Sequence, residues 1–169
     1  PSVTTTYSID SIVSGAYHGT LSGSATVTLY SVPTVFSVTG GGSYCSGTTG
    51  AAINLSNSQI GVNYQLYDGS SPVGSVVSGT GSAISFGSFT TATTYTATAT
   101  NVFGCITNMT GSAVVTIDPL PTVYSVTGTG SYCSGGTGVV LGLNNSQLGI
   151  NYQLYNGGTT AGSPVAGTG

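Results

Sequence analysis

The stretch that decides the fold reads PTVFSVTGGGSYCSG from Pro33 and continues as NSQIGVNYQLYDG from Asn57. It recurs as PTVYSVTGTGSYCSG from Pro121 and NSQLGINYQLYNG from Asn145, a displacement of 88 residues (121 − 33). Without a gap, 32 of the 49 aligned positions up to Gly81 and Gly169 are identical. A period of this length indicates tandem whole domains, because solenoid units are only about 20–50 residues long.

The segment before this stretch fits the same period. Thr5–Pro33 aligns without a gap to Thr93–Pro121, and 9 of 29 positions are identical. The period predicts three parts: the C-terminal part of one repeat in residues 1–32, a complete repeat in residues 33–120, and the N-terminal part of the next repeat in residues 121–169. We expect the chain to be a window of a longer polypeptide.

Charge is almost absent from the chain. It contains no Lys or Arg, and its three acidic residues give a formal net charge of −3. Nucleic acids and anionic lipid surfaces are bound largely through cationic side chains, so we expect neither as a partner. No apolar run is long enough to predict a membrane-spanning helix, and we expect no membrane insertion. Plentiful Val, Ile, Thr and Tyr favour a folded, β-rich chain over disorder.

Short β-like runs alternate with turn signals through the complete repeat. Thr93–Thr100 alternates strictly, and Asp68-Gly69 is a strong hairpin signal. The pattern predicts an all-β fold of tandem immunoglobulin-like β-sandwich domains with an 88-residue period. The expected strands are Thr34–Thr39, Ala51–Leu55, Val62–Tyr67, Val73–Val77, Ala83–Phe86, Thr93–Thr100 and Ala113–Ile117.

The joints between repeats contain proline rather than a flexible Gly/Ser run. The last strand of the complete repeat is expected to end at Ile117 and the next repeat to begin its first strand near Thr122, with Asp-Pro-Leu-Pro between them. Short proline-containing joints are semi-rigid. Repeats joined end to end are therefore expected to form a stiff rod.

Two short motifs carry a resemblance to a known family. Tyr-Cys-Ser-Gly at Tyr44–Gly47 and Asn-x-x-Gly-Cys at Asn101–Cys105, with the Tyr-rich strands between them, resemble the tandem Ig-like (PKD-like) repeats of large secreted Bacteroidota surface proteins. These include gliding adhesins and substrates of type IX secretion. The resemblance covers the whole chain, but Tyr17 stands where the complete repeat has Cys105.

The cysteines allow two interpretations. Cys45 and Cys133 occupy one position in successive repeats, and Cys105 is the only other cysteine. One hypothesis is a disulfide between Cys45 and Cys105, with Cys133 bonded to a residue outside the chain; closing such a loop would stabilise a small domain by about 4 kcal/mol. The alternative is free, buried thiols. Simple Ig topology places Cys45 and Cys105 at opposite poles, so the disulfide requires the first strand to cross over.

The residues needed for catalysis or metal binding are missing. Calcium needs six to eight clustered oxygen ligands, whereas Asp10, Asp68 and Asp118 are far apart in the sequence. The single histidine, His18, lies outside the complete repeat, and general acid–base catalysis needs a positioned His, Lys or carboxylate pair. We expect no catalytic residue, no metal site and no cofactor.

Modification and ligand contact involve other residues. Asp10-Ser11-Ile12 resembles the Asp-Ser/Thr-apolar motif that Bacteroidota O-glycosylate on exported proteins, which implies Ser11 as an acceptor; an unmodified strand residue is the alternative. The strand tyrosines could line a glycan-binding face, since tyrosine offers a flat ring with a polar tip, but their alternation favours core and cross-strand packing. Tyr67 and Tyr155 precede hairpin turns and are the candidate exposed aromatic contacts.

The function favoured by these patterns is structural. We expect an extracellular stalk or filament of tandem Ig-like domains on a bacterial surface, with neighbouring repeats or copies of the chain as partners in a fibre. One continuous polypeptide is favoured over shorter subunits joined by strand complementation. The alternative function is that of an adhesin whose repeats bind surface polysaccharide or other cells.

Overall fold

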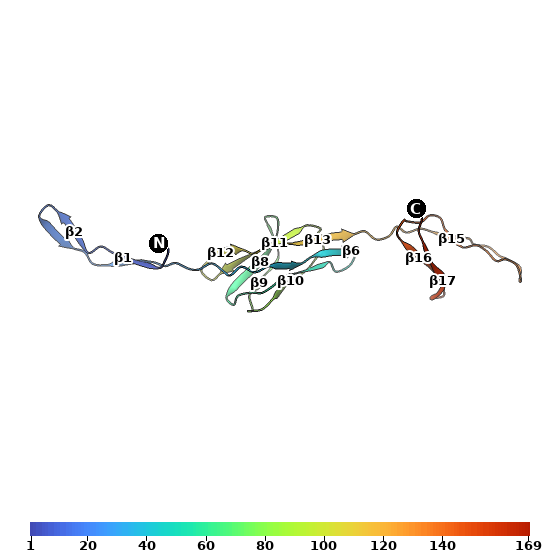
Figure 1. Ribbon diagram of the computed structural model, residues 1–169, viewed down its shortest axis with the longest axis horizontal. Coiled ribbons are helices and arrows are strands. Elements are labelled where there is room, and N and C mark those ends of the chain that lie inside the picture. The colour runs from blue at the N-terminus through green and yellow to red at the C-terminus, as the bar shows by residue number, and fades with distance from the viewer. The chain divides into compact units, whose positions relative to one another are not determined.

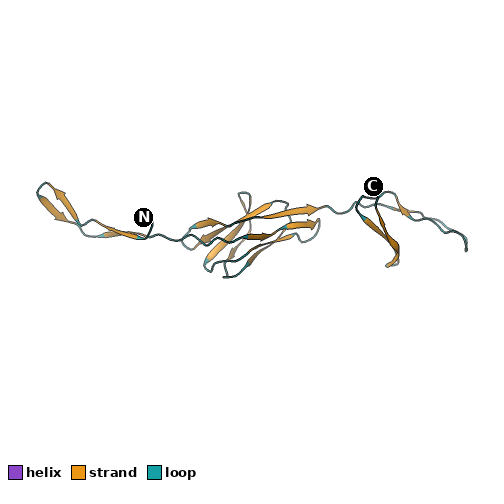
Figure 2. Cartoon of the chain, viewed as in Figure 1, coloured by secondary structure: helices purple, strands orange, loops and turns teal.

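The structure is a computed structural model that describes all 169 residues. The chain divides into two compact units, Pro1–Asp118 and Pro119–Gly169. Both consist of strands and loops only (Figure 2), so the predicted all-β class is confirmed. The structure contains no helix of the length and apolarity that crossing a membrane requires.

Seventeen strands follow one another along the chain (Figure 1). The first unit contains β1 (Thr5–Ser8), β2 (Ser11–Ser14), β3 (Tyr17–Thr20), β4 (Ser24–Val27), β5 (Val38–Gly40), β6 (Gly42–Cys45), β7 (Ala51–Leu55), β8 (Val62–Asp68), β9 (Ser71–Ser78), β10 (Ile84–Phe89), β11 (Thr94–Asn101), β12 (Ile106–Asn108) and β13 (Ala113–Asp118). The second contains β14 (Val126–Thr127), β15 (Gly142–Leu143), β16 (Asn151–Asn156) and β17 (Thr159–Ala166).

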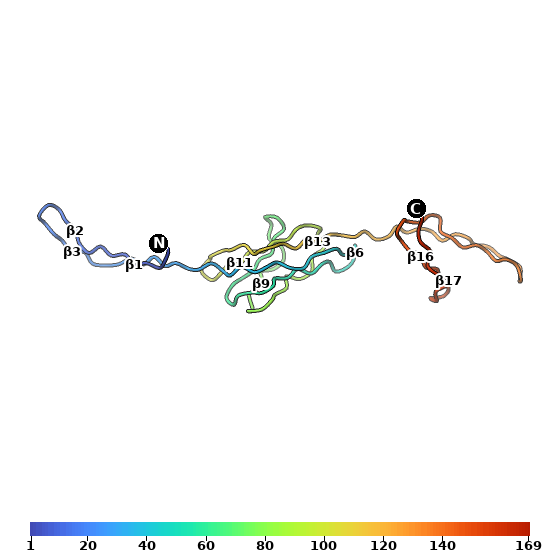
Figure 3. Tube along the Cα trace, in the orientation of Figure 1, coloured from blue at the N-terminus to red at the C-terminus, as the bar shows by residue number.

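Strands β5 to β13 form a two-layer sandwich, whose path can be followed in Figure 3. One sheet has the order β10-β7-β5, and the other has the order β6-β13-β11-β8-β9, with β12 paired to β11. All strand pairs are antiparallel except β13 with β6. The first strand is thus split between the two layers, because β5 belongs to one sheet and β6 to the other.

A glycine run makes that split. β5 pairs with β7, the chain crosses at Gly41, and β6 pairs with β13 in the other sheet. Gly41 has a φ of 79°, and a Cβ on it would lie 2.5 Å from the Val114 carbonyl oxygen. Only glycine combines a positive φ with such a close backbone approach. The crossing therefore depends on the glycine run that follows the predicted strand Thr34–Thr39.

Six of the seven expected strands lie within three residues of their predicted bounds. The first is wrong: β5 begins at Val38, and the preceding residues follow the β12–β13 connection instead. There the Thr110 amide donates to the Phe36 carbonyl (2.9 Å), and the Val38 amide donates to the Thr110 carbonyl (2.8 Å). β12 was not expected, because three residues are too few to show an alternating pattern.

The core lies between the two layers. Alternating residues of β7, β8 and β11 face it, which explains the period-two pattern of these strands. Tyr64 is fully buried, and its hydroxyl accepts a hydrogen bond from the Gln59 amide (2.8 Å). The buried apolar residues are Val38, Ala51, Ile53, Leu55, Val62, Tyr64, Leu66, Ile84, Tyr95, Ala97, Ala99, Met109, Ala113 and Val115.

The segment before the sandwich contains two small sheets. β1 pairs with β4, and β2 pairs with β3, both antiparallel. Neither sheet covers the other with a core, and nearly all of their residues are exposed. This segment presents apolar side chains to solvent, among them Tyr7 and Ile9.

The unit Pro119–Gly169 also consists of two small sheets. β14 pairs with β15, and β16 forms a hairpin with β17. Hydrogen bonds of the sandwich recur here 88 residues later: the Thr122 amide donates to Gln147 Oε1 as the Thr34 amide does to Gln59 Oε1. This unit has counterparts of β5, β7, β8 and β9 and none of β6 or β10–β13.

Candidate functional site

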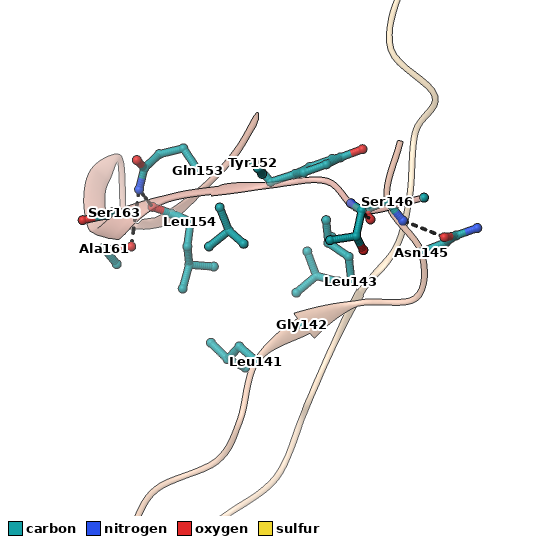
Figure 4. Close-up of a pocket in the computed structure, with 15 residues that line it drawn as sticks. Leu141, Gly142, Leu143, Asn145, Ser146, Tyr152, Gln153, Leu154, Ala161 and Ser163 are labelled. Carbon is teal, nitrogen blue, oxygen red and sulfur yellow. Dashed lines mark hydrogen bonds between the residues drawn. The ribbon is translucent and has the colours of Figure 1, made fainter. Parts of the chain in front are cut away.

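An open apolar groove crosses the unit Pro119–Gly169 (Figure 4). Its volume is about 640 Å³. Leu154 projects from the β16–β17 hairpin toward the strand that carries Leu143. The apolar side chains that line the groove are Val126, Leu141, Leu143, Leu154, Ala161, Val165 and Ala166.

Four of these groove residues, Val126, Leu141, Leu143 and Leu154, stand at core positions of the sandwich. Leu143 and Leu154 follow Leu55 and Leu66 by 88 residues, and both of those leucines are 0% exposed. Leu154 is instead 42% exposed. In the sandwich the same surface is covered by residues of β10, β11 and β13, and this unit has no strand in their places. The groove is therefore an uncovered half of a core.

Polar side chains that also line the groove hold its strands together. Gln153 Nε2 donates to the carbonyl oxygens of Leu154 (2.9 Å) and Ala161 (3.3 Å), which ties β16 to β17. The Tyr152 hydroxyl accepts a bond from the Gln147 amide (2.9 Å). Gln65 and Tyr64 make the equivalent bonds in the sandwich. The uncovered half of a core therefore has the same local hydrogen bonds as the complete core of the sandwich.

One edge of the groove is an unpaired strand. β16 has β17 as its only neighbour, whereas β8 lies between β9 and β11. An edge of this kind presents free amide and carbonyl groups and can accept a further strand. No charged residue lines the groove, so burying a ligand there carries no cost of desolvating an ion. The chemistry of the site suits an uncharged, extended, apolar segment.

A second pocket lies on the sandwich and includes one of the predicted aromatic contacts. Its volume is about 420 Å³. Tyr67, Thr96, Thr98 and Asn108 bring a ring, hydroxyls and an amide to it. Tyr67 is half-buried there, whereas Tyr155, the equivalent residue of the other unit, is 60% exposed.

The three cysteines are free thiols, and the structure does not bring Cys45 and Cys105 together. Cys45 ends β6 beside Asp118, and Cys105 follows β11 next to β12. Figure 1 shows β6 and β12 at opposite ends of the sandwich. The first strand does change sheets, but the change leaves Cys45 at its original pole. The structure therefore contains no bond between Cys45 and Cys105; Cys133, 88 residues after Cys45, is exposed.

The pole that carries Cys105 holds the joint that enters the sandwich. The Tyr30 and Phe103 rings stack with centroids 3.8 Å apart and planes at 10°. Asn101 Nδ2 donates to the Ser31 carbonyl (2.8 Å), and the Cys105 thiol lies 3.9 Å from the Tyr30 carbonyl oxygen. We call these residues the joint clamp. The Asn-x-x-Gly-Cys motif is visible in the sequence, but its contact with the preceding chain is not, because Tyr30 and Ser31 are about 70 residues away from it.

The clamp loop is itself braced by Asn101. Its Oδ1 accepts hydrogen bonds from the Phe103 amide (3.0 Å) and the Cys105 amide (2.9 Å). One side chain thus folds the loop and holds the joint. An aspartate carboxylate in its place could accept the two loop bonds but could not donate to Ser31, since it has no donor.

The other predicted residues are isolated. Ser11 lies exposed in β2, opposite Thr20, and is accessible to modification in this arrangement. His18 is exposed in β3. No three His, Cys, Asp or Glu residues lie close enough together to hold a metal ion.

Comparison with known proteins gives one match. The sequence model of the family described as "Ig-like domain CHU_C associated" matches residues 32–119, which is more than half of the chain and coincides with the sandwich. This family is a domain of Bacteroidota-type surface proteins. No curated protein and no solved structure matches the chain. The chain belongs to this family of Ig-like domains.

Proposed function

We propose that the chain is a structural element of an extracellular stalk or filament, built from tandem Ig-like domains on a bacterial surface and without catalytic activity. Ig-like domains of this family are typically non-catalytic and occur in surface proteins. The sandwich core is made of apolar residues and of Tyr64 and Tyr95, whose hydroxyls are hydrogen-bonded to the backbone. It contains no buried ionisable pair that could serve as a catalytic site.

The joint clamp is the observation that carries this proposal. A stalk must transmit force from domain to domain, so its joints must resist bending. Here a ring stack, worth about 0.5–1.5 kcal/mol beyond its buried area, and a hydrogen bond from Asn101 to Ser31 attach the incoming chain to the end of the sandwich. On the other side of Pro33, the Thr34 amide is bonded to Gln59.

The proposal predicts that breaking the clamp loosens the joint and leaves the sandwich folded. In Phe103→Ser and Asn101→Ala variants, residual dipolar couplings of β1–β4 should become smaller than those of the sandwich, because the two segments no longer tumble together. In the native chain both segments should fit one alignment tensor. Phe103 is 58% exposed, so its loss removes little from the core.

Tyr132→Ser is the matched control, since Tyr132 is exposed and lies outside the joint. It should leave all couplings of the first unit unchanged. If β1–β4 and the sandwich of the native chain required different alignment tensors, the joint would not be stiff. That result would contradict the proposed stalk.

A second candidate function, polysaccharide binding, is favoured by the pocket at Tyr67. A tyrosine ring flanked by Thr96, Thr98 and Asn108 offers the stacking surface and the neutral hydrogen-bonding groups that suit an uncharged sugar. Titration with neutral oligosaccharides should then shift the amide resonances of Thr96 and Thr98, and Tyr67→Ala should abolish the shifts while Tyr132→Ala preserves them. Unchanged spectra across a panel of such glycans would remove this candidate.

A further inference from the structure

The two cysteines of the sandwich each lie beside the chain at one of its joints. Cys105 is at the end where the chain enters, and its thiol lies 3.9 Å from the Tyr30 carbonyl oxygen. Cys45 ends β6 at the opposite end of the sandwich (Figure 1), where it pairs with Asp118 of β13. Neither thiol is bonded within the sandwich. The fold therefore places both cysteines at repeat boundaries and keeps them apart from each other.

Tyr30 and Asp118 occupy the same position in successive joints. Asp118 follows Tyr30 by 88 residues (118 − 30), the displacement at which the stretch that decides the fold recurs. Cys105 approaches this position from the repeat that follows a joint, whereas Cys45 approaches it from the repeat that precedes a joint. Two cysteine positions that lie at opposite ends of one sandwich thus converge on one residue of the joint between two sandwiches.

The polar contacts of the joint clamp are made to main-chain atoms. The Cys105 thiol faces the carbonyl of Tyr30, and Asn101 Nδ2 donates to the carbonyl of Ser31 (2.8 Å). Any residue offers a carbonyl, including proline. The two contacts can therefore form at a joint of different sequence, and only the ring stack on Phe103 requires an aromatic residue in place of Tyr30.

The carbonyl of Asp118 can take part in contacts from both sides of its joint. It accepts a hydrogen bond from the Ser46 amide (3.0 Å), and Ser46 directly follows Cys45 in the chain. A carbonyl oxygen has two lone pairs, so this bond leaves room for a second neighbour. A thiol that contacts Asp118 as Cys105 contacts Tyr30 would lie beside Cys45.

Cys45 is also accessible to a bonding partner, since it is exposed at the end of its strand. A disulfide links residues whose Cα atoms are about 4.4–6.8 Å apart, which is close to the spacing of about 4.8 Å between neighbouring strands. The bond thus requires a second cysteine to approach Cys45 about as closely as a strand neighbour does.

We propose that tandem repeats of this chain are cross-linked by a disulfide across each joint. Where two complete repeats follow one another, Cys45 of the first bonds to the cysteine at the position of Cys105 in the second. The proposal rests on the proposed function, because it requires repeats in tandem. It assigns the cysteines of the Tyr-Cys-Ser-Gly and Asn-x-x-Gly-Cys motifs to bonds between sandwiches, in place of the bond predicted within one sandwich.

Formation of this bond is a two-electron oxidation. The two protein thiols lose two electrons and two protons and become one disulfide, while glutathione disulfide takes them up and leaves as two glutathione thiols. An extracellular setting, as in the proposed function, favours the oxidised form.

The disulfide would strengthen a joint rather than a core. Asp118 stands where the first joint has Tyr30, so the second joint has no counterpart of the ring stack. A covalent bond between Cys45 and the following repeat would hold that joint in its place. Pulling the repeats apart would then load the bond directly.

A chain lengthened by one copy of its own complete repeat tests the proposal. A second copy of residues 33–120 is inserted after Leu120, so that two complete repeats meet at the unchanged sequence Asp118-Pro119-Leu120. All buried core residues of the repeat lie between Val38 and Val115, so the inserted copy brings its entire core. In dilute solution with glutathione disulfide, two protein thiols per lengthened chain should form a disulfide. The original chain should form none.

Single substitutions identify the bonded pair, because the two copies give identical peptides. Cys45→Ser in the first copy should abolish the disulfide, and so should Cys105→Ser in the second copy. The same two substitutions exchanged between the copies are the matched controls and should leave the bond in place. In the controls, peptide mapping without reduction should join a Tyr-Cys-Ser-Gly peptide to an Asn-Val-Phe-Gly-Cys peptide.

Three results would overturn the proposal: no disulfide in the lengthened chain, a disulfide that survives Cys45→Ser in the first copy, or one that links two molecules. Bonds within each sandwich would produce the second result, because the second copy would keep its own pair. The stiffness of the joint at Tyr30 is measured on the original chain without any disulfide. Failure of the cross-link would therefore leave the test of the proposed function unchanged.

Discussion

At the scale of single residues, glycine decides how the sandwich closes. Gly41 lets the first strand leave one sheet and join the other, because its positive φ and its approach to the Val114 carbonyl exclude any side chain. The sequence shows a run of three glycines, which a pattern argument interprets as the end of a strand. What shows that the chain crosses between sheets here, rather than ending a strand, is the close approach of Val114 in β13, more than seventy residues later in the sequence.

Gly41→Ala should therefore destabilise the sandwich more than the same change at Gly61. Both glycines have a φ of 79°, but a Cβ at Gly61 meets nothing within 4 Å. The left-handed backbone alone costs about 1–2 kcal/mol for alanine, and the clash at Gly41 should at least double that loss. Urea unfolding monitored by tyrosine fluorescence measures both, and equal losses would show that the crossing tolerates a side chain.

At the scale of elements, alternation and turn residues were sufficient to predict most of the sandwich. Thr93–Thr100 and Val62–Tyr67 were predicted nearly to the residue because every second side chain is buried. β12 was missed because it is short, and Thr34–Thr39 was misplaced because its partner, Thr110, is distant in the sequence. A single sequence contains no local pattern from which a pairing between residues so far apart can be predicted.

The candidate sites show the same limit at this scale. Cys133 follows Cys45 by one 88-residue period, which indicated that the two cysteines occupy the same position in successive repeats. The spacing did not show at which end of the sandwich that position lies. The structure places Cys105 at the joint, where it contacts the carbonyl of Tyr30. The groove likewise could not be predicted from the sequence, since its leucines follow the same alternating pattern as buried residues. Periodicity predicts which residues face a core, and only the structure shows whether that core is covered.

At the scale of the whole molecule, the main feature is that one structural pattern recurs along the chain. Hydrogen bonds and strand registers recur 88 residues apart in the two units. The joint between the N-terminal segment and the sandwich is held by side-chain contacts rather than by proline alone. A chain without Lys or Arg depends on hydroxyl and amide groups for its solubility, and such a surface adds no charge repulsion between neighbouring units.

Electron micrographs of native material that contains the chain test the central claim, a stiff stalk of tandem Ig-like domains, most directly. Sandwiches with strands of six to eight residues are about 20–26 Å long at 3.3 Å per residue. With stiff joints they predict straight rods or fibres with a regular axial repeat of a few tens of Å. Isolated globules, or beads on a freely bending thread, would contradict it.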